Sequence, residues 1–197
     1  NGADPRYTGE LLGTSVLDPN GFLTTRAFAA SYRTIRTAQI LLNALPNTVA
    51  TLSTAQSNGF TGFANTMIAY QRLLLLNRQF QNGIRLDVVD PEALGPFVSY
   101  DEGMGAVASQ LDAAAADLGS GELPFNISSG FSLGGDNPAE DLRLINRALA
   151  ARVALYQGNK SKALGFLGDS FFDLDGDLDM GAYHVFGAGG GDIMNPL

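Results

Sequence analysis

The stretch A-L-A-A-R-V-A-L-Y-Q-G-N-K-S-K-A-L, residues Ala148–Leu164, decides the fold. Small side chains at Ala148 and Ala151 allow a neighbouring helix to pack closely, and we expect Tyr156 to fill the groove between the helices. Gly158 then turns the chain, because glycine readily adopts the backbone conformation that ends a helix. The stretch therefore predicts two helices joined by a tight turn.

The same stretch resembles the core of a tetratricopeptide repeat, in which each helix pair buries one face against its neighbours. A second pair, residues 60–80 with 99–118, has similar apolar periodicity, but a long insertion separates its two helices. An ordinary helical hairpin with alanine-rich packing is the alternative. The resemblance implies an all-α fold of tetratricopeptide-like helical hairpins with long irregular loops.

Apolar residues recur at three- and four-residue intervals through much of the chain, which predicts about five helices and almost no strand. We expect helices to hold more than half of the residues and strands less than about a tenth. Caps and helix breakers place these helices from Thr24 or Thr25 to Pro46, from Phe60 to Asn82-Gly83, from Ser99 to Leu118, from Asn137 to Gly158, and from Lys160 to about Leu167. An earlier helix start within Thr48–Ser57 is expected to be interrupted at Asn58-Gly59.

These elements divide the chain into three parts. Turn-forming pairs such as Asp4-Pro5 and Asn20-Gly21 indicate an irregular N-terminal segment over 1–23. The helices fill 24–170, and an irregular tail rich in Asp and Gly follows over 171–197. One core within the helical part is expected to contain Tyr70, Leu74, Leu111, Leu149, Val153 and Tyr156.

An ordered series of segments resembles the SusD/RagB family of outer-membrane nutrient-uptake lipoproteins. The segments are Tyr32–Leu45 (Y-R-T-I-R-T-A-Q-I-L-L-N-A-L), Gly62–Tyr70 (G-F-A-N-T-M-I-A-Y), Asn82–Asp87 (N-G-I-R-L-D), Ser99–Glu102 (S-Y-D-E), Gln110–Leu118 (Q-L-D-A-A-A-A-D-L) and Asn146–Gly158 (N-R-A-L-A-A-R-V-A-L-Y-Q-G). Asp4–Leu12 and Tyr183–Phe186 are similar to a branch of the family. The resemblance covers residues 1–170 and assigns 24–170 to the N-terminal, helical-repeat part of the family fold.

The resemblance implies a binding protein rather than an enzyme. Family members are exposed at the surface of the bacterial outer membrane, where they cap a TonB-dependent, SusC-like transporter and capture glycans or peptides. We expect this chain to be a piece of a longer precursor. The lipid anchor and the C-terminal part of the family fold, which usually contributes the ligand site, are expected outside it. A rival expectation is a helical-repeat protein-interaction module or a self-assembling extracellular structural protein.

The composition of the chain disfavours or excludes several other classes of function. The formal net charge of -8 disfavours nucleic acid, because phosphate contacts need Lys and Arg. The sequence has no cysteine, which excludes disulfides and thiolate metal sites, and no apolar run reaches the ~18 residues of a membrane helix. His184 is its one histidine, and P-loop, G-x-S-x-G and H-E-x-x-H motifs are absent. We therefore expect no enzyme activity.

Four aromatic residues of the tail are the candidate ligand-binding residues: Phe171, Phe172, Tyr183 and Phe186. Carbohydrate sites often stack the apolar face of a sugar on an aromatic ring, which offers a large rigid surface. The alternative, which we favour from the sequence, is that these side chains anchor an irregular tail to the helices.

The tail also carries four carboxylates at alternate positions: Asp173, Asp175, Asp177 and Asp179. They could converge on one calcium ion, which takes about six to eight oxygen ligands. The pattern departs from an EF-hand, because Gly176 occupies the fourth position of the loop rather than the sixth. The alternative, which we favour, turns Leu174 and Leu178 inward and leaves the acids in solvent. No other cofactor is expected.

Overall fold

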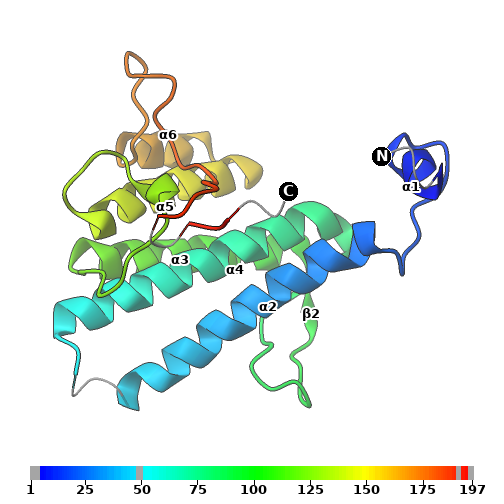
Figure 1. The fold of residues 1–197 in the computed structure, drawn as a ribbon, viewed down its shortest axis with the longest axis horizontal. Helices are drawn as coiled ribbons and strands as arrows, with labels where there is room; N and C mark the ends of the chain where they lie inside the picture. Colours follow the sequence, from blue (N-terminus) through cyan, green and yellow to red (C-terminus); the bar gives the residue numbers. More distant parts are fainter. Residues whose placement is uncertain (1–4, 48–50, 190–191, 195–197) are drawn as a thin grey trace.

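The computed structural model describes residues 5–47, 51–189 and 192–194, and predictions for the other residues, such as Asp4 and Gly190-Gly191, lie outside it. The described chain is 61% helical, which confirms the all-α fold (Figure 1). Its α-helices are α1 (Pro5–Leu11), α2 (Phe22–Ala44), α3 (Thr54–Gln79), α4 (Tyr100–Gly119), α5 (Pro138–Tyr156) and α6 (Lys160–Gly168). Short 3-10 turns and one two-stranded sheet complete the described elements: η1 (Leu45–Asn47), η2 (Phe80–Asn82), η3 (Ser129–Phe131), β1 (Ile84–Arg85) and β2 (Phe97–Val98).

The five longer helices pack in chain order, each mainly against its neighbours in sequence. Figure 1 shows α2 and α3 running in opposite directions, with α5 and α6 on the other side of the α3–α4 pair. The short helix α1 lies apart from this body. Because α3 contacts α2, α4 and α5, it is the central helix of the fold. Within the described ranges, no helix combines the length and the apolar character that a membrane span requires.

Side-chain caps start α3, α4, α5 and α6 and satisfy backbone N–H groups that have no partner within the helix. Ser99 and Glu102 form the predicted capping box at the start of α4, and a second box joins Ser53 and Gln56 before α3. The Asn137 side chain accepts from two backbone N–H groups at the start of α5, as predicted. These starts depend on residues only two or three positions apart, which is why the sequence reveals them.

The start of α2 differs from the prediction. Its N-cap is Gly21, rather than Thr24 or Thr25, and α2 begins at Phe22. The hydroxyl groups of Thr24 and Thr25 each donate to the Gly21 carbonyl oxygen at 2.9 Å, so both threonines lie inside the first turn. The segment predicted to be irregular therefore contains the seven-residue helix α1 and the first two residues of α2.

The predicted interruption at Asn58-Gly59 is wrong, because α3 runs unbroken through both residues. A Cβ atom at Gly59 would collide with the backbone oxygen of Glu122, in the segment after α4. A Cβ atom at Gly62 would lie 2.6 Å from Cγ of Leu118. These two glycines therefore serve the close approach of another segment rather than a turn.

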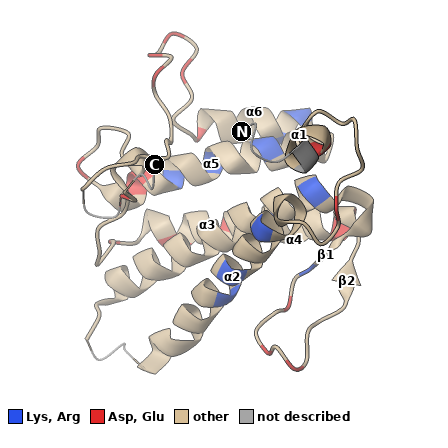
Figure 2. Cartoon of the chain, turned by 45° about the vertical axis from the view of Figure 1, so that its right-hand side comes forward, with Lys and Arg blue, Asp and Glu red and all other residues tan. Residues whose placement is uncertain are grey.

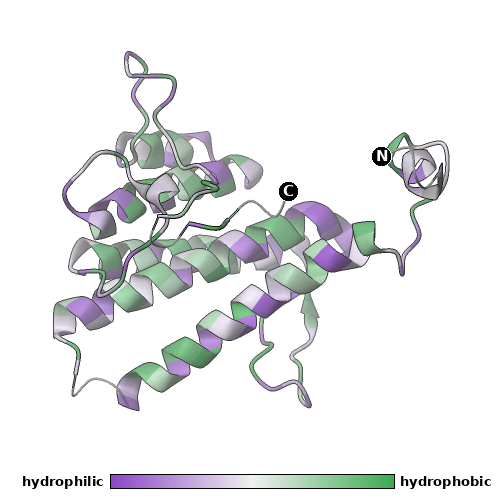
Figure 3. Ribbon diagram, in the orientation of Figure 1, coloured by the Kyte–Doolittle hydropathy of each residue, from purple (hydrophilic) through white to green (hydrophobic). Residues whose placement is uncertain are grey.

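The main core lies between α2, α3, α4 and α5, where apolar residues colour the helices in Figure 3. Leu111 and Val153 are buried in it, as predicted. Tyr70, Leu74 and Leu149 are only partly buried. The prediction for Tyr156 is wrong, since it is 47% exposed. It is the last residue of α5, where the chain turns away from the core.

An arm between α3 and α4 contains the small antiparallel sheet. The predicted extended piece over Ile84–Val89 is real but only two residues of it form β1. The Arg85 backbone N–H donates to the Tyr32 hydroxyl at 2.8 Å, and Arg72 donates to the Leu86 oxygen at 2.6 Å. Burial raises the pKa of Tyr32 and lowers the pKa of Arg72, because each charged form loses solvent.

Candidate functional site

The tail that follows α6 returns to the helical body and is fastened to the loop between α4 and α5. The Tyr183 backbone N–H donates to the Gly130 oxygen at 2.8 Å. The Asp192 carboxylate accepts from the Ser128 hydroxyl at 2.7 Å and from the Ser129 backbone N–H at 3.0 Å. The hydrogen bond from the Ser128 side chain is the main cause that lowers the pKa of Asp192, so this attachment is strongest when the carboxylate is charged.

Between the fastened tail and the helices lies a cavity of about 510 Å³, here called the tail cavity. Its lining comes from α3, α5, the loop between α4 and α5, and the tail. The lining combines aliphatic side chains with aromatic rings and one cation, and its aromatic and charged members are Tyr70, Phe131, Arg152, Phe171, Tyr183 and His184. The volume lies within the range of about 300–1,000 Å³ that small-ligand sites occupy.

A buried chain of hydrogen bonds beneath the tail cavity joins α3, α4 and α5. Asn146, which is fully buried, donates to the hydroxyl of Thr66, a cavity-lining residue, at 2.9 Å. Arg147 donates to the Asn146 side-chain oxygen and to the Leu111 backbone oxygen, at 2.6 Å each. The Arg147 guanidinium also pairs with Asp112 at 2.9 Å. Such a satisfied network holds the three helices in one arrangement, because leaving any buried partner unpaired is costly.

The structure brings two of the four candidate ligand-binding residues together. Phe171 and Tyr183 line the tail cavity. Phe186 does not line the cavity. The centroid of its ring lies 4.5 Å from the ring centroid of His184, which is a lining residue. Phe172 is 50% exposed and lies outside the lining. Tyr183 also anchors the tail through its backbone. This residue therefore fits both alternatives from the sequence, the anchoring of the tail and the lining of a ligand site.

Most of the lining residues were not candidates from the sequence, and three of those with aromatic or charged side chains show why. Tyr70 belongs to an apolar stripe of α3 that the periodicity assigns to the core. Arg152 interrupts the apolar run A-A-R-V-A, and a cation in such a run was a usable signal. Phe131 lies in a loop rich in Gly and Ser, where nothing local distinguishes it from an ordinary loop residue.

The predicted calcium ligands of residues 173–179 do not converge. Among the residues that the structure describes, no group of three or more His, Asp or Glu side chains could hold a metal ion. The carboxylates of Asp173 and Asp177 instead accept backbone N–H groups two residues further on, at 3.0 and 2.9 Å. The expectation that Leu174 and Leu178 turn inward is wrong, since they are 87% and 99% exposed. Their loop projects away from the helices, with its acidic residues spread along it (Figure 2).

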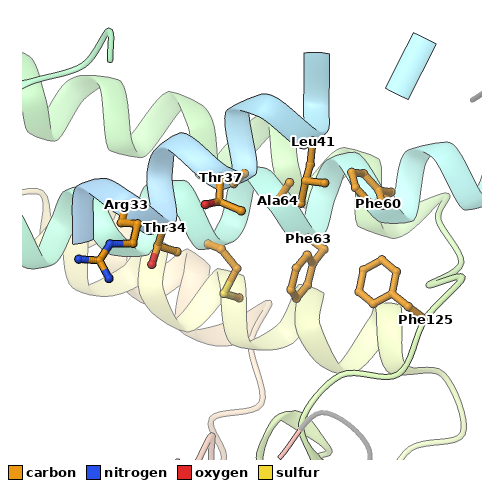
Figure 4. Close-up of a pocket in the computed structure, with 10 residues that line it drawn as sticks. Arg33, Thr34, Thr37, Leu41, Phe60, Phe63, Ala64 and Phe125 are labelled. Carbon is orange, nitrogen blue, oxygen red and sulfur yellow. The ribbon is translucent and has the colours of Figure 1, made fainter. Parts of the chain in front are cut away.

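A second hollow of about 610 Å³, here called the α2–α3 groove, lies between α2 and α3 (Figure 4). Leu41 from α2 and the rings of Phe60 and Phe63 from α3 line it. Phe125, from the loop after α4, contacts these two rings edge-on at centroid distances of 5.8 and 5.1 Å. Arg33 lies at the opposite end of the groove in Figure 4, so the groove is apolar along most of its length.

No protein-family model, curated protein or solved structure matches this chain. Because nothing matches, the class of this protein is described only by its fold and by the geometry of its site. It is an all-α protein in which a fastened tail, a loop and two helices border an open cavity lined by aliphatic and aromatic side chains and one cationic side chain.

Proposed function

We propose that this chain is the helical part of a SusD/RagB-type nutrient-binding protein that captures a glycan or a peptide at the bacterial cell surface. One observation carries the proposal: aromatic side chains from three separate segments line the tail cavity. Tyr70 comes from α3, Phe131 from the loop between α4 and α5, and Phe171 and Tyr183 from the tail. The last two are also residues that the sequence singles out. Rigid aromatic surfaces of this kind bind sugar rings and apolar peptide side chains.

In this proposal the scaffold is tetratricopeptide-like and the partner is a TonB-dependent, SusC-like transporter. The packing of the helices in chain order supports the scaffold, as do Ala151 and Ala163, which are each only 2% exposed between α5 and its neighbours. A lipid anchor would hold the protein at the outer-membrane surface. Co-purification of the chain with the transporter barrel, from cells that express both, tests the partnership.

The side chains of the tail cavity support binding rather than catalysis. A nucleophilic serine would donate its hydrogen bond to a histidine base. Here the Ser128 hydroxyl donates to the Asp192 carboxylate, whereas the His184 ring packs on Phe186. None of the described residues that line the cavity is a carboxylate that could act as a general base.

Two adjacent phenylalanines test the proposed site. Phe171 lines the tail cavity and Phe172 does not, although both belong to the same segment. In calorimetric titrations with the glycans or peptides that bind on an array, we expect Phe171→Ala to weaken affinity about tenfold, because it removes a stacking surface. Phe172→Ala is the matched control and should leave affinity unchanged. Equal losses in both variants, or no binding of any glycan or peptide, would contradict the proposal.

A second candidate function, protein interaction or self-assembly, has its own support in the α2–α3 groove. Leu41, which lines the groove, is 48% exposed and its neighbour Ile40 is 51% exposed, and open apolar surfaces mark interaction sites. Light scattering over a range of protein concentrations distinguishes the two candidates. Assembly that Leu41→Glu abolishes would favour this second function. A monomer at every concentration, combined with ligand binding in the tail cavity, would favour nutrient capture.

A further inference from the structure

Helix α5 carries three arginines, and carboxylates neutralise two of them. Arg143 pairs with Glu140 at 2.7 Å, and the hydrogen bond from Arg143 lowers the pKa of Glu140. Arg147 pairs with Asp112 at 2.9 Å. Arg152 has neither an ion pair nor a hydrogen bond with any residue in the described part of the chain. Arg152 is also exposed to solvent, so its guanidinium is accessible to a ligand at the edge of the tail cavity.

No carboxylate of the described chain pairs with Arg152, and the carboxylate beside the tail cavity, that of Asp192, is bonded to Ser128 and Ser129 instead. Among its described lining residues none is acidic, and Arg152 is the one permanent cation. The chain as a whole has 20 acidic side chains against 12 Lys and Arg, so carboxylates are plentiful elsewhere. A cavity edge that presents an exposed guanidinium without a paired carboxylate favours an anionic occupant, because the N–H donors of that guanidinium are not engaged by the protein.

We infer that the ligand of the tail cavity is an acidic oligosaccharide whose uronate carboxylate binds Arg152. A guanidinium offers planar N–H donors that match the two oxygens of a carboxylate. Tyr70, Phe171 and Tyr183 supply aromatic surface for the sugar rings beside that carboxylate. This inference rests on the proposed function and names its substrate class.

A sugar acid fits the cavity better than the free end of a peptide. Peptides are commonly held by main-chain hydrogen bonds, which need a sheet edge or other unpaired backbone groups. α3 and α5 provide about half of the lining, and backbone groups inside a helix already bond to one another. The rest comes from the tail and the loop between α4 and α5, where the Tyr183 backbone N–H is already bonded to the Gly130 oxygen. The Tyr70 hydroxyl, in contrast, has no hydrogen bond within the described chain and can serve a sugar hydroxyl.

Matched pairs of ligands test the inference on the full chain. The probes are uronate oligosaccharides, such as oligogalacturonate, and their methyl esters, which lack the charge. In calorimetric titrations we expect the wild type to bind the acid at least about tenfold tighter than the ester, a preference typical of hydrogen bonds to charged groups. Arg152→Gln should reduce this ratio to about one. Arg152→Lys should retain part of it, because lysine keeps the charge without the planar donors.

Arg143→Gln is the control, because it removes the same charge from the same helix outside the cavity and should keep the preference. Equal binding of acid and ester by the wild type, or an undiminished preference in Arg152→Gln, overturns the inference but leaves the proposed function intact. A preference for peptides with a free terminal carboxylate over amidated ones, lost in Arg152→Gln, overturns the assignment to a sugar. Absence of binding to every glycan and peptide overturns the proposed function as well.

Discussion

Two stripes of α3, offset from one another by one residue, have opposite roles. The stripe that the periodicity of the sequence reveals steps by three and four residues through Phe60, Phe63, Met67, Tyr70, Leu74 and Asn77, and the predicted core includes its members Tyr70 and Leu74. One buried stripe, one residue earlier along the helix, is Gly59, Gly62, Thr66, Ala69, Leu73 and Leu76, and Ala64, Ile68 and Leu75 are buried one residue later. Neighbouring residues differ by about 100° around the helix axis. The predicted stripe lies at the edge of the core, where Phe60, Phe63 and Met67 line the α2–α3 groove and Met67 and Tyr70 line the tail cavity.

Side-chain size explains the difference between the stripes. In its first half the buried stripe consists of small residues, because α4 and the segment after it approach α3 closely there. Bulky side chains cannot occupy such a contact, so they stand beside it and line the hollows on either side. A prediction from hydrophobicity alone indicates the bulkier stripe as the buried one, since glycine and threonine add little to an apolar pattern.

The largest expected effect compares two leucines at the end of these stripes. Leu76 is fully buried against Gly103 of α4, whereas Leu74 is only partly buried. We expect Leu76→Ala to lower the free energy of unfolding by about 2–5 kcal/mol, because it removes buried apolar atoms and leaves a cavity. Leu74→Ala should cost clearly less, since less area leaves water at that position. Urea unfolding measures both, and equal losses would show that the stripes do not differ in burial.

A pair of glycine variants sharpens the size argument. Gly59→Ala places a methyl group against the backbone of Glu122, which cannot move aside as a flexible side chain could. We expect a loss of about 1–3 kcal/mol in the free energy of unfolding. Gly105→Ala in α4 meets no atom within 4 Å, so the better helix propensity of alanine should stabilise the protein by up to about 1 kcal/mol. Thermal melting should therefore shift in opposite directions, and shifts of the same sign would refute the close contact at Gly59.

The smallest effect concerns the tail that covers the partly buried stripe. The pKa of Asp192 is lower in the folded protein than in the unfolded chain. The contribution of its carboxylate to the attachment of the tail is therefore fully present above the unfolded pKa of about 3.9, and it is lost as pH falls through the lower, folded pKa. Hydrogen-exchange protection of the Ser129 and Tyr183 amides should thus decrease in strong acid. Asp192→Asn should show the weak protection already at neutral pH. Asp175→Asn, in the projecting loop, is the control, and an acid-independent protection factor in the wild type would exclude this role of Asp192.

Local signals in the sequence predicted much of the fold. The capping box of Ser99 with Glu102, the cap at Asn137 and the helix stop at Gly158 each depend on residues within a few positions of one another. The start of α2 was misplaced because Gly21 and Thr24 are both acceptable caps, and their geometry decides between them.

Part of the candidate site could also be predicted. Aromatic residues in a tail rich in Gly and Asp pointed to Phe171 and Tyr183, which line the tail cavity. Their neighbour Arg152 could not be connected to them, because the loop and the tail first have to be fastened through Asp192. Phe172 could not be distinguished from Phe171 by composition, and only its position outside the lining separates the two.

The sequence by itself determined that the chain is mostly helical, the caps at Ser99 and Asn137, the acidic charge and the absence of thiol chemistry, since these depend on residue type and on neighbours within one or two turns. Tertiary structure alone decided which stripe of α3 is buried, which arginine of α5 lacks a carboxylate, and where the tail returns. These properties depend on how closely distant segments approach, as at Gly59 and Gly130. Steric fit and charge pairing between such segments are set only when the whole chain has packed, and no local pattern encodes them.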